Sequence, residues 1–182
     1  MKITFRRIKK GSPDIGIVKN LYTKAFPAEE RAPFLLLLLR SSKPGIDFWS
    51  VDCNGRWAGM LYVVSHKDLS YLFYLAVDKD LRGMGVGSAI LQAARKRYAG
   101  RRLFLAIEEL DEKAENYPER IRRRDFYVRN GFTELHRKLR EGRVLYDILG
   151  CGGDVKPAEY KALIKCFSGS ILLKFFTMEF VD

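Results

Sequence analysis

The sequence predicts an α/β fold in a single domain, with a mixed sheet flanked by helices. Apolar runs at 46–53, 56–65 and 69–77 are joined by short links, the first of which is Asn54-Gly55. Asn-Gly between apolar runs is the strongest short-range hairpin signal, so these runs predict an antiparallel meander. A glycine-rich loop and a helical pattern then lead to another apolar run at 103–108. A helical crossover of this kind predicts a central parallel pair between that run and 69–77.

The remaining elements are predicted from local signals, taken in chain order. Proline marks expected helix starts and stops, and glycine marks helix ends and turns. The expected elements are a strand at 2–8, helices at about 12–26 and 29–41, a helix at 86–99 closed by Gly100, a helix at 117–130 closed by Gly131, strands at 132–140 and 143–149, and a helix at 157–167 opened by Pro157. The apolar tail at 171–180 predicts one more strand, paired with a sheet edge or a partner subunit. We therefore expect a folded region over 1–150, and a C-terminal helix and tail over 151–182 that pack on it or on a second copy in a homodimer.

Composition limits the partners. The net charge of +11 over 182 residues favours an anionic partner such as nucleic acid, membrane lipid or a phosphorylated cofactor. The scattered cysteines, Cys53, Cys151 and Cys166, predict reduced thiols and a cytoplasmic location. Two histidines and no paired cysteines make no zinc pattern, so no metal is expected. The apolar run at 34–39 is far shorter than the roughly twenty residues of a membrane span, and no secretory signal is visible.

The segment Arg82-Gly-Met-Gly-Val-Gly87 lies between a predicted strand and a predicted helix. Glycines allow a tight turn and a close approach to the backbone, and a helix start offers unpaired N–H groups and the positive end of a dipole. Together these features predict a diphosphate socket. A dinucleotide fingerprint fits less well, because Ser88 stands at its last glycine position and several residues separate the strand from Gly83.

The element order resembles that of the GNAT superfamily of N-acetyltransferases, and three segments carry the resemblance over about residues 1–150. Arg82–Gly87 is similar to the pyrophosphate loop of that family, and Leu75-Ala-Val77 to the strand that pairs with the pantetheine arm. Phe126-Tyr-Val-Arg-Asn-Gly-Phe132 is similar to its Tyr-x-x-x-Gly-Phe signature. The resemblance implies a GNAT-like fold, acetyl-CoA as the donor, transfer to an amine, and a splay between the parallel strands where the thioester sits. The residues it assigns to the cofactor are Leu75, Ala76, Val77, Arg82, Gly83, Met84, Gly85, Val86, Gly87, Ser88 and Phe126.

Acetyl transfer to an amine requires a neutral amine, a donor for the oxyanion and a donor for the thiolate. The resemblance points the phenol of Tyr127 at the sulfur, and with the implied splay it makes the backbone N–H of Val77 or a neighbour the expected donor to the oxyanion. A phenol titrates near 10 and a thiol near 8.5, so we expect Tyr127 to give a hydrogen bond rather than its proton. Glu108, at a strand end, is the predicted base or the ligand of a cationic acceptor, and Glu109 is the alternative. No cysteine lies at the predicted splay, which favours direct transfer.

Many members of the family have an asparagine seven residues before this tyrosine, where the present chain has Arg120. Arg120 and its neighbours Arg122, Arg123 and Arg124 are interpreted either as a substitute that orients the pantetheine or as a solvated face. Basic side chains near helix ends are further candidates for the cofactor phosphates: Arg82, Lys96, Arg97, Arg101 and Arg102. Glu29 and Glu30 line the acceptor entrance or form an ordinary acidic helix start.

The acceptor is expected to be an amine of a small molecule or a peptide, and its identity is not encoded in any readable motif. Two other functions remain open: an acyl-CoA sensor without catalysis, and a basic nucleic-acid-binding module. The aromatic residues follow core periodicities rather than exposed basic–aromatic runs, which argues against nucleic acid.

Overall fold

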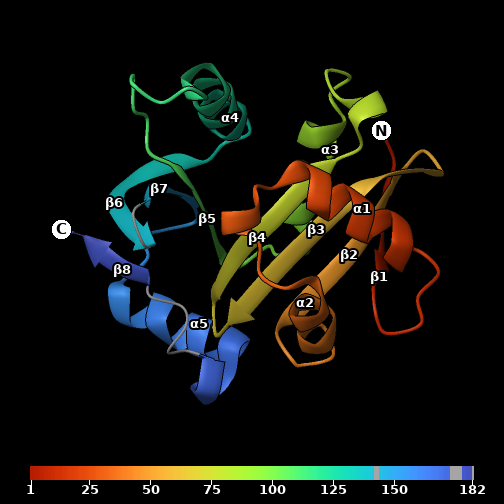
Figure 1. Ribbon diagram of the computed structural model, residues 1–182, viewed down its shortest axis with the longest axis horizontal. Helices are drawn as coiled ribbons and strands as arrows, with labels where there is room; N and C mark the ends of the chain where they lie inside the picture. Colours follow the sequence, from red (N-terminus) through yellow and green to blue (C-terminus); the bar gives the residue numbers. More distant parts are fainter. Residues whose placement is uncertain (142–143, 173–177, 182) are drawn as a thin grey trace. The chain divides into compact units, whose positions relative to one another are not determined.

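The computed structural model describes residues 1–141, 144–172 and 178–181, and it divides into two compact units (Figure 1). The first unit comprises Met1–Val64 and Leu72–Arg97, and the second comprises Ser65–Tyr71 and Tyr98–Asp182. The elements are β1 Ile3–Arg7, α1 Ile15–Ala25, η1 Ala28–Glu30, α2 Phe34–Arg40, β2 Ile46–Cys53, β3 Arg56–His66, β4 Leu69–Val77, η2 Lys79–Leu81, α3 Val86–Arg97, β5 Arg102–Glu108, α4 Tyr117–Arg129, β6 Thr133–Glu141, β7 Val144–Cys151, α5 Pro157–Leu172 and β8 Met178–Val181.

Backbone pairing gives the strand order β1-β2-β3-β4-β5-β7-β6-β8. Strand β4 begins in the second unit, where Leu69–Tyr71 pair in parallel with Arg102–Phe104 of β5, and it ends in the first unit. The β1–β2, β2–β3, β5–β7 and β6–β7 pairs are antiparallel. The predicted α/β class, with an antiparallel meander and a parallel strand pair in a mixed sheet, is therefore confirmed.

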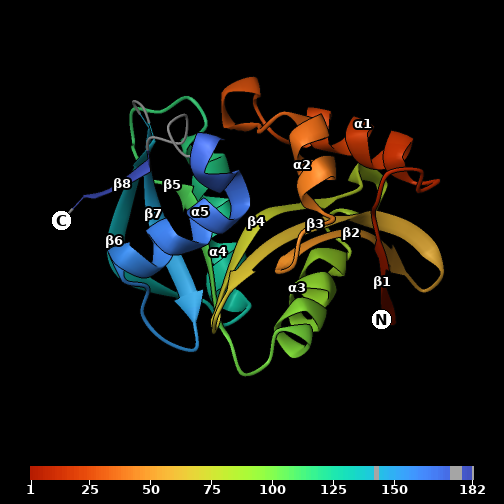
Figure 2. The ribbon, with the colours of Figure 1, turned by 90° about the horizontal axis from the view of Figure 1, so that it is seen from below.

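In the first unit, α1 and α2 cover one face of the strands and α3 covers the other (Figure 2). Helix α1 buries Val18, Leu21 and Tyr22 at helical spacing, and the Tyr22 ring meets that of Tyr74 edge-on with centroids 5.0 Å apart. Aromatic rings at this distance and angle contribute beyond the area they bury. Packing against β4 thus fixes the helix that the sequence pattern predicted.

The second predicted helix, at 29–41, is too long, because α2 starts only at Phe34. Pro33 precedes its first turn, and a proline disfavours helical backbone in the residue before it. The Tyr74 hydroxyl also accepts a hydrogen bond from the Ala32 backbone N–H at 3.0 Å, which holds this link in a non-helical path.

In the second unit, Tyr71 stacks on Phe104 with centroids 4.6 Å apart and planes 5° from parallel. Tyr160 of α5 meets both rings edge-on, which docks α5 on the β4–β5 pair. Helix α5 runs further than the predicted 157–167, with a break at Gly169. In the predicted tail strand, 171–172 belong to α5, 173–177 lie outside the described residues, and 178–181 form β8, which pairs antiparallel with β6 of the same chain. No described helix is long and apolar enough to span a membrane.

Candidate functional site

The glycine loop follows β4 in the first unit. The Asp78 side chain caps the short helix η2 by accepting the Asp80 backbone N–H at 3.0 Å, and the chain then turns into α3. Gly83 and Gly85 both have φ of +76°, where an L side chain is strained. A Cβ on Gly83 would meet no atom within 4 Å, and one on Gly85 would meet only the Met1 side chain at 3.6 Å. Glycine is therefore required by the backbone conformation, and the space beside it is open.

Among the described residues, the backbone N–H groups from Gly83 to Gly87 make no backbone hydrogen bond of good geometry. The first bond of α3 runs from the Ala89 N–H to the Gly85 carbonyl at 3.0 Å. The Arg82 Nε donates to the Val77 carbonyl at 3.1 Å and so ties the loop to the end of β4. Unpaired N–H groups at the positive end of a helix dipole suit a diphosphate. The residues of this loop therefore fit the diphosphate that the sequence predicts at this position.

The end of β4 lies close against β3. A Cβ on Gly59 would come within 2.2 Å of the Ala76 carbonyl oxygen, so only glycine permits this approach. The Asp78 N–H donates to the Ala58 carbonyl at 2.9 Å just beyond it. Leu75, Ala76 and Val77 are thus held next to the loop in one unit. The assignment of the Val77 N–H to an oxyanion stays a prediction.

The Tyr-x-x-x-Gly-Phe segment forms the C-terminal cap of α4 in the second unit. The Phe132 N–H donates to the Tyr127 carbonyl at 3.1 Å, and the Gly131 N–H donates to the Val128 carbonyl at 2.9 Å. With Gly131 at φ of +81°, this is a Schellman motif. The Tyr127 and Phe132 rings, 5.9 Å apart, supply the apolar contact that accompanies such a cap. The motif therefore fixes the position of Tyr127 through helix termination, and Phe126 packs on it edge-on at 5.1 Å.

Tyr127 is 9% exposed, and its hydroxyl forms no hydrogen bond with the described residues. Burial raises the pKa of Tyr127 to about 12, against a smaller lowering by Arg123. The phenol is therefore fully protonated at neutral pH and available as a donor.

Glu108 ends β5 and is 8% exposed. Its carboxylate binds Nη2 of Arg120 at 2.9 Å and Nη1 of Arg123 at 2.8 Å, and it accepts from the Asn116 Nδ2 at 3.2 Å. These three partners lie at helical spacing along one face near the start of α4. Sequence analysis missed this ion-pair cluster, although the spacing of its members was a usable signal. The role of Glu108 as a base stays a prediction, and its contacts add a role in anchoring α4 to β5.

The solvated-face interpretation is wrong for Arg120 and Arg124. Arg120 is mostly buried, and its Nη1 also donates to the Glu109 carbonyl at 2.7 Å. Arg124 pairs with Glu134 of β6. Arg122, by contrast, pairs with Glu119 on the exposed side of α4.

Besides Arg82, three more of the cations proposed for the cofactor phosphates have partners within the chain. The Arg97 guanidinium stacks 4.2 Å from the Trp49 ring centroid, and Arg101 donates to the Lys67 carbonyl at 2.6 Å. Arg102 binds Asp68, just before β4, and Glu159 of α5, which ties the start of β5 to both elements. In the acceptor region, the Glu30 carbonyl accepts the Tyr74 hydroxyl at 2.9 Å.

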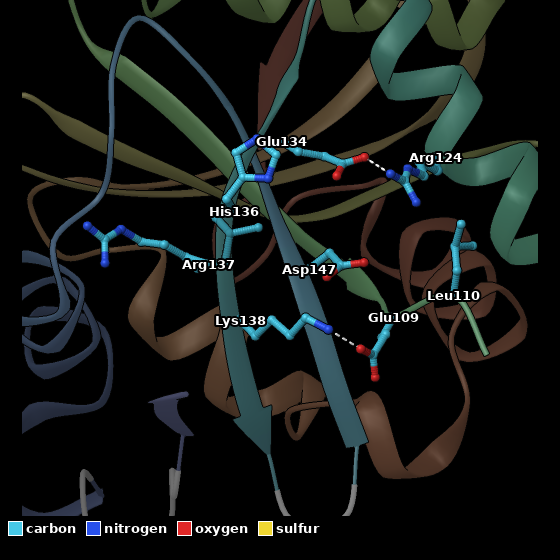
Figure 3. Close-up of a pocket in the computed structure, with 9 residues that line it drawn as sticks. Glu109, Leu110, Arg124, Glu134, His136, Arg137, Lys138 and Asp147 are labelled. Carbon is cyan, nitrogen blue, oxygen red and sulfur yellow. Dashed lines mark hydrogen bonds and ion pairs between the residues drawn. The ribbon is translucent and has the colours of Figure 1, made fainter. Parts of the chain in front are cut away.

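The second unit also contains a cavity of about 400 Å³ between β6, β7 and α4 (Figure 3). Glu109, the alternative base, lines it and pairs with Lys138. No group of three or more potential metal ligands is found among the described residues.

Comparisons with known proteins agree with the geometry. Residues 44–134 match the family model described as the acetyltransferase (GNAT) domain. No curated protein sequence matches the chain. Similar solved structures include a Bacteroides thetaiotaomicron protein assigned to the GNAT acetyltransferases, which has a TM-score of 0.72 and 18% identity over 93% of this chain and 98% of that one. The ribosomal-protein-S18-alanine N-acetyltransferase of Escherichia coli has a TM-score of 0.60 and 18% identity over 85% of this chain and 96% of its own. An aminoglycoside 6'-N-acetyltransferase complexed with coenzyme A has a TM-score of 0.63 and 14% identity over 82% and 96%.

Proposed function

The chain belongs to the GNAT acetyltransferase family, and from this premise we propose that it transfers an acetyl group from acetyl-CoA directly to a primary amine of a small molecule or a protein. The observation that carries the proposal is the run of backbone N–H groups from Gly83 to Gly87, at the start of α3, that have no well-formed backbone partner among the described residues. Such a run binds an anion through backbone dipoles, and the family membership makes the diphosphate of coenzyme A the candidate. The coenzyme A complex of the aminoglycoside 6'-N-acetyltransferase, which shares the fold, supports the same choice.

In this proposal acetyl-CoA supplies an acetyl thioester, which is activated toward an amine. The loop from Arg82 to Ser88 holds the diphosphate, and Leu75–Val77 lie beside the pantetheine arm. The Val77 N–H stabilises the negative charge that develops on the carbonyl oxygen. Tyr127 donates a hydrogen bond to the departing sulfur, because its hydroxyl is protonated and has no described partner. The amine attacks in its neutral form, so the rate rises with pH as the acceptor loses its proton.

Glycine variants test the binding part of the proposal. Gly83→Ala and Gly85→Ala place a methyl group where the protein leaves space, with at most an ordinary contact to Met1 at Gly85. Gly55→Ala makes the same change at φ of +82° in the β2–β3 turn, with no atom within 4 Å. All three substitutions introduce a similar backbone strain, which destabilises the fold by on the order of 1 kcal/mol. We expect the loop variants to raise the calorimetric Kd for acetyl-CoA at least tenfold, and Gly55→Ala to leave it within twofold. Equal Kd values in all three variants would contradict the assignment of the loop.

A panel of amines tests turnover. Thiol release from acetyl-CoA is measured with amino acids, polyamines, aminoglycosides, peptides with free N-termini and lysine peptides. We expect at least one amine to accelerate release and to appear as its N-acetyl product. Saturable acetyl-CoA binding with no accelerated release across the panel would favour the sensor, and tight RNA or DNA binding that falls steeply with salt would favour the nucleic-acid module.

A further inference from the structure

A break in the pairing of β6 with β7 forms the cavity in the second unit, which we call the β6–β7 pocket. The register between the strands shifts between Glu134 and Lys138, and His136 takes a φ of +51°. A Cβ on Gly150 of β7 would lie 2.9 Å from the Leu135 side chain, so that leucine packs directly over the glycine. Irregularities of this kind bend a strand and redirect its side chains, and they are common beside functional sites. Here the bend leaves a concavity of about 400 Å³, enough for a small molecule.

Most of the charges on the pocket wall are neutralised within the chain. Arg124 pairs with Glu134, and Lys138 pairs with Glu109. A third cation, Arg137, binds Asp154, a residue outside the pocket lining, at 2.9 Å. Each lysine and arginine on the wall therefore already has a carboxylate partner.

Asp147 of β7 also carries a carboxylate on the pocket wall, and unlike Glu109 and Glu134 it forms no ion pair with the described residues. Figure 3 shows it between the Arg124–Glu134 pair and the Lys138–Glu109 pair, and it lines the pocket. Its backbone pairs with that of Lys138. Its carboxylate accepts no hydrogen bond from the residues that the structure describes. Burial raises the pKa of Asp147, and the nearby Glu109 charge acts in the same direction, while Lys138 and Arg124 oppose them. A partly desolvated carboxylate without a donor gains the most from a ligand that brings both N–H groups and positive charge.

The chemistry of the wall selects the ligand class. An anion would have to displace a carboxylate from an existing pair. A metal ion would need several converging ligands, and no such group occurs in the described part of the chain. A compact cation with several donors meets both the charge and the hydrogen-bond capacity of Asp147. We propose that the β6–β7 pocket binds the primary ammonium group of a small organic cation through Asp147.

This binding does not depend on acetyl transfer. The ammonium group belongs either to an amine that is acetylated or to an amine that binds without reacting. Arg124 lies one helical turn before Tyr127 on α4, so the pocket wall and the proposed sulfur donor share a helix. A ligand at Asp147 therefore lies against the wall formed by the helix that carries Tyr127, whether or not that ligand is acetylated.

Titration with n-butylamine, followed by backbone amide NMR shifts, tests the proposal, with 1-butanol as an uncharged probe of similar size. Asp147→Asn keeps the shape of the side chain and removes its charge. Asp125→Asn makes the same change on the exposed side of α4, outside the pocket lining. We expect saturable butylamine binding with shifts centred on Asp147 and Lys138, and a Kd at least about tenfold higher in Asp147→Asn. Asp125→Asn should match the wild type, and 1-butanol should not saturate.

Three results would overturn the proposal: no saturable binding, the same Kd in Asp147→Asn as in the wild type, or shifts in the wild type centred away from the pocket. The last criterion needs no variant, so it holds even if Asp147→Asn folds poorly. Adding acetyl-CoA to the butylamine complex identifies the source. N-acetylbutylamine that forms more slowly in Asp147→Asn supports the pocket as an acceptor site, and binding without acetylation supports it as the site of a non-reacting amine.

Discussion

Replacing Tyr127 with phenylalanine removes one hydroxyl from a ring that the cap of α4 holds in place. With the phenol pKa raised to about 12, full proton transfer to a thiolate with a pKa near 8.5 is uphill by about 5 kcal/mol. A hydrogen bond to a charged group contributes about 1.5–3 kcal/mol. We therefore expect Tyr127→Phe to lower kcat by roughly 10- to 100-fold. The Kd for acetyl-CoA should change by less than about threefold, because the hydroxyl acts mainly as charge develops on the sulfur.

The pH dependence separates a hydrogen bond from proton transfer. Burial raises the pKa of the phenol, so Tyr127 stays protonated up to about pH 12 and contributes no ionisation between pH 6 and 10. The wild type and Tyr127→Phe should therefore give parallel profiles of log kcat/KM, with both rising as the acceptor amine deprotonates.

The assay is thiol release at saturating acetyl-CoA with an acceptor from the amine panel. Tyr117→Phe, at the first position of α4, is the matched control and should retain wild-type turnover. Unchanged kcat in Tyr127→Phe would remove the donor role. A loss beyond about 10⁴-fold, together with a wild-type ionisation that disappears in the variant, would refute the hydrogen-bond mechanism in favour of proton transfer.

Substitutions at three further positions test the framework around the site. Glu108→Ala leaves two guanidinium groups without their buried partner and should cost about 3 kcal/mol, or roughly 6–12 °C in Tm by thermal unfolding. Glu108→Gln should keep the wild-type pH–rate profile if the carboxylate is an anchor, and loss of an acidic limb would show it to be the base. Gly59→Ala sets a Cβ 2.2 Å from the Ala76 carbonyl oxygen and should lower the unfolding free energy by more than about 2 kcal/mol in urea. Arg102 lowers the pKa of Glu159 to about 2, below its unfolded value near 4.3, so the stabilisation is present above about pH 4.3 and is lost as the pH falls toward 2. Arg102→Met should therefore flatten the fall in the urea midpoint between pH 5 and pH 3, and an equally steep fall would contradict this linkage.

Elements that depend on local signals were predictable from the sequence. Asn54 and Gly55 both adopt positive φ, as a two-residue hairpin turn requires, and β2 and β3 pair as expected. Gly131 ends α4 because glycine has no Cβ and therefore adopts the φ of +81° without a steric clash. In both cases the conformation is set within a few residues, so no tertiary information was needed.

Features that depend on contacts between distant segments were not predictable. The start of α2 is set partly by the Tyr74 hydroxyl, which comes from a strand about forty residues later. The β6–β7 pocket depends on a strand irregularity at His136, a position without glycine or proline to mark it. The partners of Glu108 lie on a helix whose docking is itself a tertiary result. A pattern of residue types can identify charged or polar side chains as candidates for such contacts, but it cannot show which of them meet in the fold.

The positive net charge of the chain acts in opposite directions on the two proposed ligands, acetyl-CoA and a protonated amine. At a net charge of +11, the long-range field attracts an anionic donor such as acetyl-CoA and repels a protonated amine. The donor can therefore be held by backbone N–H groups, with little need for dedicated side-chain cations, and Arg97, Arg101 and Arg102 are indeed engaged elsewhere. An amine can dwell on such a protein only where a carboxylate is left unneutralised at short range, since screening limits the field to roughly 8 Å at physiological salt. Asp147 meets that condition, so raising the salt concentration should weaken acetyl-CoA binding while changing butylamine binding much less. Equal salt slopes for the two ligands would show that the overall field, rather than the local carboxylate, governs amine binding.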